Sequence, residues 1–512
     1  MNTLPAAWQE AFRRDAGAAK PDYADPLPER RLARLLAAFI GAGLVFLVLP
    51  GTLLGVWNLL RISSAHEALS VSKIWIQSHG HAQLFGWVGS FIIGISLYTV
   101  PKFRGGAIRS LAAGWAMFFL WTAAIAARWA SALWEWHWQP VWRAAACAEL
   151  LVALLLVWQS TATGRSRTRA ELWNHLVFAG YAGFIAVLAM QAAVVWNLPA
   201  PLIPDAPNGV LLNLALWAFC FPVVWGFSTR FLPSFLGLSK PGSRSAYAGL
   251  ACLAAAVALL AAGRATPAAI LIAGAVGCAC WSLRIFHPAG RPAKTIGVDP
   301  HYPAFVRLSY GWLAAASVLA ATGRTPGLTG ASRHAFTVGF LATLIFALGP
   351  RILPSFLNSR ELWSKRLMPV SLLLLGAGCL ARVVSEPLAY SGLVPAAWHV
   401  LPVSAMAELA AVLLFAWNIA RTLASPVPAW IVARTVREDL PLYWYVSSYP
   451  ETRRLLVRAG LKTLERSRKV PWSLTLREAA EADGIASGPL ILLLREHFAR
   501  RMARTLRAKG DA

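Results

Sequence analysis

Charged residues are scarce in this chain of 512 residues. Asp, Glu, Lys and Arg make up 14% of it, whereas apolar residues make up 57% and the mean hydropathy is +0.54. Ordinary soluble proteins carry about 25% charged residues. A soluble fold cannot cover so much apolar surface, and disordered, collagen-like and small secreted proteins have other compositions. The composition therefore predicts a polytopic membrane protein.

Cysteine and acidic residues are also few. No loop spacing among the six cysteines suggests a disulfide framework or a zinc site, because all of them fall inside apolar stretches, at Cys147, Cys220, Cys252, Cys278, Cys280 and Cys379. Asp and Glu number 23 against 48 Lys and Arg, which leaves a net charge of +25. The basic residues lie between apolar runs rather than on one soluble face, so we expect no nucleic-acid partner.

Apolar segments of about 20 residues follow one another after a polar stretch at residues 1–32. Each is long enough to cross a hydrocarbon core of about 30 Å, and backbone groups in lipid must be satisfied within a helix. We count twelve, centred near residues 45, 90, 118, 152, 185, 220, 254, 275, 313, 342, 375 and 410. The fold class is therefore all-α, with a cytoplasmic N-terminal tail at 1–32 and a twelve-helix transmembrane domain at 33–425.

Basic residues predict the orientation of these helices. One set of connections is rich in them, for example Lys102, Arg104 and Arg109, whereas the alternate set, which includes Arg128 and Arg143, is sparser. The positive-inside rule then places both termini in the cytoplasm. We expect a multi-pass protein of the bacterial inner membrane, surrounded by lipid.

An internal repeat divides the twelve segments into three groups of four. Similar four-residue motifs end the second, sixth and tenth segments, around Pro101, Pro233 and Pro354, which are 132 and 121 residues apart. The fourth and twelfth segments share Ala-Glu-Leu, at Glu149 and Glu408. These matches predict pseudo-threefold symmetry, and the alternative is that similar loops arose by chance.

Two histidines occupy equivalent places in this repeat. Twenty residues before the repeat prolines, and so about 30 Å along the helices, lie His81, Asn213 and His334; five residues further lie Gly86, Ala218 and Gly339. A histidine inside a membrane helix is costly and is functional by default. Two imidazoles at one depth, each followed by a glycine, suit a planar macrocycle between them, with b-type haem as the expected cofactor. The alternative is an imidazole that bonds to a neighbouring helix or lies at the interface.

Other polar residues of the segments have several interpretations. On a regular helix His79 points about 200° away from His81. Three roles are open to it: a copper ligand, a partner of a haem propionate or an interfacial residue. His66 and His399 are candidates to join it, because clusters of imidazoles suit copper. Glu149 and Glu408 belong either to a proton path or to hydrogen bonds between helices.

Three motifs resemble those of the NnrS family, membrane proteins related to subunit one of the haem-copper oxidases. Residues 78–87 (SHGHAQLFGW) are similar to the second-helix signature, residues 333–339 (RHAFTVG) to a second His segment, and residues 310–312 (YGW) to a further helix. The resemblance implies haem and copper binding and a role in handling nitric oxide. In the oxidases, helices two and ten supply both axial histidines of the low-spin haem, which here are His81 and His334.

The chain departs from these families at two places. Ala82-Gln83 stands where the NnrS pattern usually has Glu-Met, and the sixth and seventh segments lack the histidines that hold copper in the oxidases. An oxygen-reducing centre is therefore not expected, and an oxidoreductase acting on nitric oxide, with an unknown electron donor, is one candidate activity. A membrane transporter and a haem or copper assembly factor are the alternatives.

Soluble composition returns at residues 440–512. The segment predicts a small helical cytoplasmic domain and resembles a short domain of unknown function associated with hybrid-cluster proteins. Leu461-Lys462-Thr463 replaces the cysteine pair that often follows the glycine there. We expect a docking or regulatory module, and a solvated basic tail is the alternative.

Overall fold

The computed structural model describes residues 4–16, 30–161, 171–322, 325–356, 362–424 and 436–507. Every regular element in these ranges is a helix, apart from an isolated bridge between Pro441 and Thr475. The chain forms two compact units. We call residues 31–353 with 362–420 the membrane unit, and residues 1–30, 354–361 and 421–512 the terminal unit.

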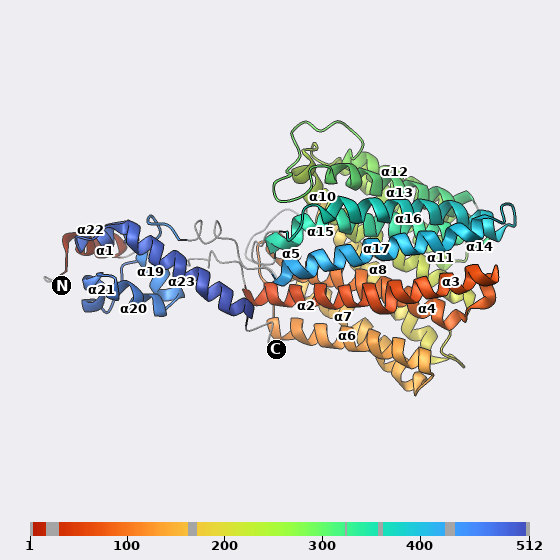
Figure 1. Cartoon of the computed structure of the whole chain (residues 1–512), viewed down its shortest axis with the longest axis horizontal. Helices are drawn as coiled ribbons and strands as arrows, with labels where there is room; N and C mark the ends of the chain where they lie inside the picture. Colours follow the sequence, from red (N-terminus) through yellow and green to blue (C-terminus); the bar gives the residue numbers. More distant parts are fainter. Residues whose placement is uncertain are drawn as a thin grey trace. The chain divides into compact units, whose positions relative to one another are not determined.

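The described part of the membrane unit contains twelve helices that are long and apolar enough to cross a membrane, as predicted. Eight are continuous, namely helices three, four, five, seven, eight, nine, eleven and twelve: α6 (Leu111–Trp134), α7 (Trp138–Ser160), α8 (Leu172–Trp196), α11 (Ser243–Ala261), α12 (Ala265–Leu283), α13 (Tyr302–Thr322), α16 (Leu367–Tyr390) and α17 (Ala397–Ala424). The all-helical polytopic fold is therefore confirmed (Figure 1).

Four membrane helices include a widened π-helical turn. Helix one is α2 (Arg30–Phe46), η1 (Leu47–Leu53) and α3 (Leu54–Ala65); helix two is α4 (Lys73–His81), η3 (Ala82–Gly89) and α5 (Ser90–Phe103); helix six is α9 (Asp205–Asn213), η4 (Leu214–Cys220) and α10 (Phe221–Leu236); helix ten is α14 (Pro326–His334), η5 (Ala335–Ala342) and α15 (Thr343–Phe356). A short 3-10 helix, η2 (Ala68–Ser70), joins helices one and two.

The π turns follow the sequence repeat. Those of helices two, six and ten begin directly after His81, Asn213 and His334, the three positions that lie twenty residues before the repeat prolines. Turns of this kind are rare and often occur at functional sites. The backbone therefore repeats in step with the sequence.

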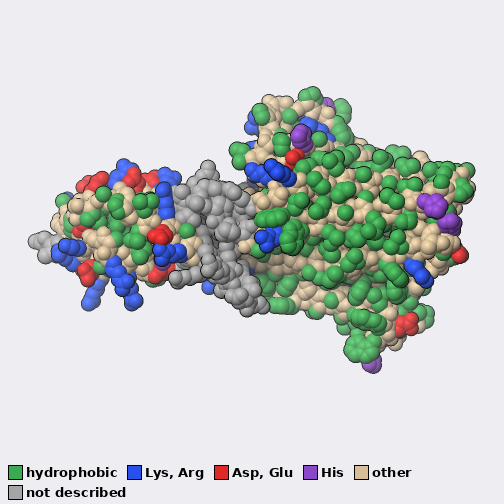
Figure 2. Space-filling view, viewed as in Figure 1, with side chains coloured by type: hydrophobic (Ala, Val, Ile, Leu, Met, Phe, Trp, Pro, Cys, Tyr) green, Lys and Arg blue, Asp and Glu red, His purple; other side chains and the backbone are tan. Residues whose placement is uncertain are grey.

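The second helix of each repeat lies in the interior of the membrane unit. In helices two, six and ten, 94%, 72% and 61% of the most apolar 18-residue window is buried, against 28–56% in the other nine described spans. Figure 2 shows hydrophobic side chains spread along the flank of this unit and most of its charged side chains near its two ends. Exposed apolar residues such as Leu373 and Val403 suit contact with lipid chains.

The terminal unit joins both ends of the chain. Its helices are α1 (Ala6–Asp15), α19 (Leu442–Ser448), α20 (Glu451–Arg458), α21 (Lys462–Arg466), α22 (Leu476–Ala482) and α23 (Ser487–Arg507). Trp8 of α1 is fully buried in the same hydrophobic core as Leu456 and Phe498. The carboxylate of Asp15 accepts a hydrogen bond of 2.7 Å from the backbone N–H of Trp472. Residues near the N-terminus are thus part of this folded unit.

Candidate functional site

His81 belongs to a buried polar group that we call the first cluster, formed with Arg128, Glu149 and Gln191. His81 is the last residue of α4, and its Nε2 lies 3.3 Å from Oε2 of Glu149 on α7. The same oxygen accepts a hydrogen bond of 2.7 Å from Nε2 of Gln191 on α8. Arg128 of α6 is electrostatically coupled to both His81 and Glu149. Glu149 therefore connects helices two, four and five.

We call two polar pairs beside α14, His334 with Glu408 and Arg382 with Glu386, the second cluster. His334 is the last residue of α14, and its Nε2 lies 2.7 Å from Oε1 of Glu408 on α17. On α16, Arg382 forms an ion pair of 3.2 Å with Glu386 one turn further along. The carboxylate of Glu386 lies where a side chain at Gly330 of α14 would be, so this glycine permits the close approach of the two helices.

The two clusters are related by the repeat. Each joins a histidine of the second helix to a glutamate of the fourth, and each has an arginine on the third helix, 27 residues after Pro101 or 28 residues after Pro354. The middle repeat has Asn213 instead, whose side-chain amide donates to the carbonyl of Gly209 within its own helix.

Arg128 and Arg382 were missed at the sequence level. The distribution of basic residues predicts that Arg128 lies in a connection between two helices, but the structure places it inside α6 with 5% exposure. The pattern was misleading because an arginine near a helix end looks the same whether it faces water or a buried carboxylate. The nearly equal spacing from the repeat prolines, 27 and 28 residues, is the signal that could have found both arginines.

Several buried polar atoms of these clusters lack a hydrogen-bond partner among the described residues. They are Nη1 of Arg128, Oε1 of Glu149 and Nη1 of Arg382. A buried polar group left unpaired costs about 1–3 kcal/mol. Both clusters thus keep unused capacity to bind water or a polar group.

His79 faces a different side of helix two. Its Nδ1 lies 2.8 Å from the carbonyl oxygen of Gly51 in helix one, and its ring packs against Gly55. Because a carbonyl only accepts, Nδ1 carries the proton and Nε2 keeps its lone pair. His79 is electrostatically coupled to His334 and Glu408. It therefore belongs to the side of helix two that meets helices one, ten and twelve.

The glycines after the two histidines accommodate aromatic rings. A Cβ atom at Gly86 would lie 2.8 Å from Cγ of Phe46, and one at Gly339 would lie 2.6 Å from Cγ of Trp312. In both repeats the ring comes from the first helix of the same repeat. A macrocycle placed beside these glycines does not fit without displacing the rings, whereas the imidazole donors themselves suit haem iron.

Two further histidines meet where α3 ends and α17 begins. The ring centroids of His66 and His399 are 6.0 Å apart, and His66 stacks on Trp398 at 5.5 Å. His66 adopts a left-handed conformation, with φ of 53°, which ends α3. Across the ranges that the structure describes, no three or more His, Cys, Asp or Glu side chains are grouped so as to hold a metal ion.

These features define a class: a polytopic helical membrane protein of three four-helix repeats, two of which carry an imidazole–carboxylate pair, buried in the first repeat and half-buried in the third. Residues 26–426 match the family model described as NnrS protein. The chain therefore belongs to the NnrS family, which is linked to haem and to the response to nitric oxide. Among curated proteins, no match is found.

Proposed function

We propose that the protein binds b-type haem in its membrane unit and serves the cellular response to nitric oxide. The observation that carries this proposal is the pair of repeat-related imidazole–carboxylate clusters in a chain of the NnrS family. Buried imidazoles in membrane helices are costly and are retained for a function. Haem bound by two imidazoles has no open coordination position, so we propose electron transfer as its task.

We further propose that His79 and His334 would hold the haem. Nδ1 of His79 donates to a backbone carbonyl, which leaves Nε2 for a metal, and this imidazole lies on the side of helix ten. The sequence pairs His81 with His334 instead, and that pairing remains a prediction. In the structure, Nε2 of His81 bonds to Glu149 and Nε2 of His334 bonds to Glu408, so this contact does not distinguish the two imidazoles.

Glu149 and Glu408 would then act on protons rather than on iron. Each carboxylate bonds to Nε2 of its imidazole, so each pair can share a proton, and Nδ1 of His334 would be the nitrogen that holds haem. We propose that these pairs accept and release the protons that accompany electron transfer. Arg128 and Arg382 offset the negative charge nearby.

We propose copper as a second metal, at His66 and His399. The two rings approach each other on exposed ends of α3 and α17, and imidazole is a good ligand for copper. The variants His66→Ala and His399→Ala should lose copper and keep haem. His137→Ala, which changes another exposed histidine, is the matched control.

We place the protein in the bacterial inner membrane with both termini in the cytoplasm. The support is the concentration of Lys and Arg in the connections that follow helices two, four and six. In a variant without native cysteines, a cysteine at Lys240 should react with an impermeant thiol reagent only after cell lysis. A cysteine at Glu135 should react in intact spheroplasts, and the reverse pattern would overturn this orientation.

A spectrum of the purified full-length protein tests the haem proposal. We expect a b-type difference spectrum between reduced and oxidised protein. His334→Ala and His79→Ala should lose haem, whereas His81→Ala and the control His137→Ala should keep it. Loss in His81→Ala with retention in His79→Ala would restore the sequence-based pairing. The absence of haem bands, or bands unchanged in His334→Ala, would refute haem binding at this site.

A further inference from the structure

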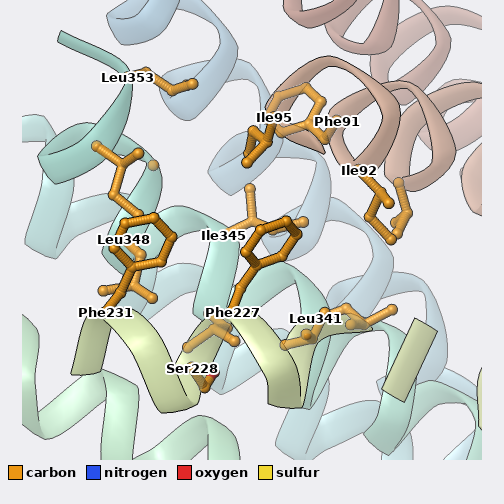
Figure 3. A pocket seen from close by; sticks show the side chains of 15 residues that line it. Phe91, Ile92, Ile95, Phe227, Ser228, Phe231, Leu341, Ile345, Leu348 and Leu353 are labelled. Carbon is orange, nitrogen blue, oxygen red and sulfur yellow. The ribbon is translucent and has the colours of Figure 1, made fainter. Parts of the chain in front are cut away.

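An apolar cavity lies between the three innermost helices of the membrane unit. It has a volume of about 110 Å³ and is lined by residues of helices two, six and ten (Figure 3). Its central residue on helix two, Ile92, lies eleven positions after His81, which is about 16 Å along the helix. The cavity is therefore separate from the histidine clusters.

The lining follows the internal repeat. Ile92, Val224 and Ile345 each lie nine residues before their repeat proline, and all three line the cavity. Six residues before the prolines, Ile95, Phe227 and Leu348 form a second such layer. The cavity is thus built at one register of the three helices, around the pseudo-threefold axis.

The chemistry of the lining excludes water. Among the fifteen residues that line the cavity, Ser228 is the one with a polar side chain. A buried water needs two to four polar partners, and an apolar cavity of about 150 Å³ in another protein stays dry and binds benzene or xenon. The cavity here is of comparable size, and apart from Ser228 its lining is apolar.

The position of the cavity favours a small molecule over a lipid chain. Helices two, six and ten are the most buried spans of the membrane unit, so the nine other helices separate much of their surface from lipid. We propose that this cavity binds one small, uncharged, apolar molecule of the size of a dissolved gas. Such molecules concentrate in the bilayer and enter without desolvation of charge.

Xenon is a suitable probe for this site. In crystals of the full-length protein under xenon pressure, we expect a xenon atom between Ile92, Val224 and Ile345. Val224→Phe should abolish that peak, because the ring fills the space, and Ile345→Phe serves if the first variant does not fold. Val318→Phe is the matched control, since Val318 on α13 is 54% exposed and faces away from the interior.

Three results would overturn the proposal: no xenon in the wild-type cavity, ordered water there, or an acyl chain occupying it. A xenon peak that persists in both filling variants would also contradict it. Xenon binds without haem, so failure here leaves the haem proposal untouched, and loss of haem leaves the xenon experiment valid.

Discussion

Single residues decide how the membrane unit tolerates buried charge. Glu149 is fully buried, yet it accepts from Gln191, bonds to His81 and lies near Arg128. Removing one partner of a buried charged group leaves the others uncompensated, which costs more than the pair contributes. The clusters are therefore conditions for folding as well as candidates for chemistry.

Replacement of Glu149 tests this interdependence. We expect Glu149→Ala to destabilise the protein by about 3–5 kcal/mol, because Arg128 loses its buried counter-charge and His81 loses a hydrogen-bond partner. Thermal unfolding of the full-length protein in detergent measures the effect. Glu67→Ala, at an exposed glutamate between helices one and two, should leave the midpoint unchanged. An unchanged midpoint in Glu149→Ala would show that the cluster contributes nothing to stability.

Glycine at the equivalent positions of repeats one and three serves close packing. We expect Gly339→Ala to cost about 1–3 kcal/mol, since the new methyl group would overlap the ring of Trp312. Gly376→Ala is the matched control, because nothing lies within 4 Å of its Cβ position. In Gly376→Ala the higher helix propensity of alanine should raise the free energy of unfolding by up to about 1 kcal/mol. Equal effects of both variants on the unfolding midpoint would contradict this difference.

At the scale of elements, the π turn of helix two begins after His81, so both histidines of this helix belong to the regular helix α4. A turn of 3.6 residues sets His79 and His81 about 200° apart, and the structure does direct them to different neighbours. The sequence cannot say which neighbour each one meets, because that depends on how helices one, three, four and ten pack around helix two. The position of each histidine along its helix was predictable, whereas the direction of each imidazole was not.

The start of α22 provides a test outside the membrane. Thr475 and Glu478 form a capping box, with Thr475 Oγ1 accepting from the Glu478 N–H and the carboxylate accepting from the Thr475 N–H. Partial burial alone would raise the pKa of Glu478, but hydrogen bonds from Thr475 and Arg14 hold this pKa below its ordinary value of 4.5. A lowered pKa in the folded state means that the carboxylate contributes stability above pH 4.5 and loses it as the pH falls further.

We therefore expect hydrogen exchange in α22 to speed up below about pH 4.5, after correction for intrinsic rates, in the full-length protein. Glu478→Gln should flatten this pH dependence. Thr475→Ala should weaken the helix start by about 1 kcal/mol at neutral pH. Glu481→Gln, at an exposed position of the same helix, is the control. A pH profile that is identical in Glu478→Gln and the wild type would exclude this carboxylate as the cause.

At the scale of the molecule, three repeats share one backbone plan but not one chemistry. All three have the π turn and the repeat proline, while the first and third have the imidazole–carboxylate cluster. Pseudo-symmetry therefore supplies the inner three helices and their apolar cavity. Among the described residues, the imidazole–carboxylate pairs lie in two of the three repeats.

The terminal unit depends on both ends of the chain. We expect Trp8→Ala to destabilise it by about 3–5 kcal/mol, because a fully buried ring leaves the core. Hydrogen exchange of α20, α22 and α23 should rise, while that of helices two and ten stays unchanged. Trp8→Phe, which keeps an aromatic ring, should have a smaller effect. Unchanged exchange in Trp8→Ala would mean that α1 is not needed for this fold.

The sequence by itself determined the twelve spans, the repeat and the positions of His81 and His334 along their helices, because apolar length and spacing along a helix are local properties. Tertiary structure decided which groups meet: His81 with Glu149, His334 with Glu408, and Phe46 and Trp312 beside the two glycines. Such contacts depend on the rotation and neighbours of each helix in the bundle. No single segment encodes those quantities.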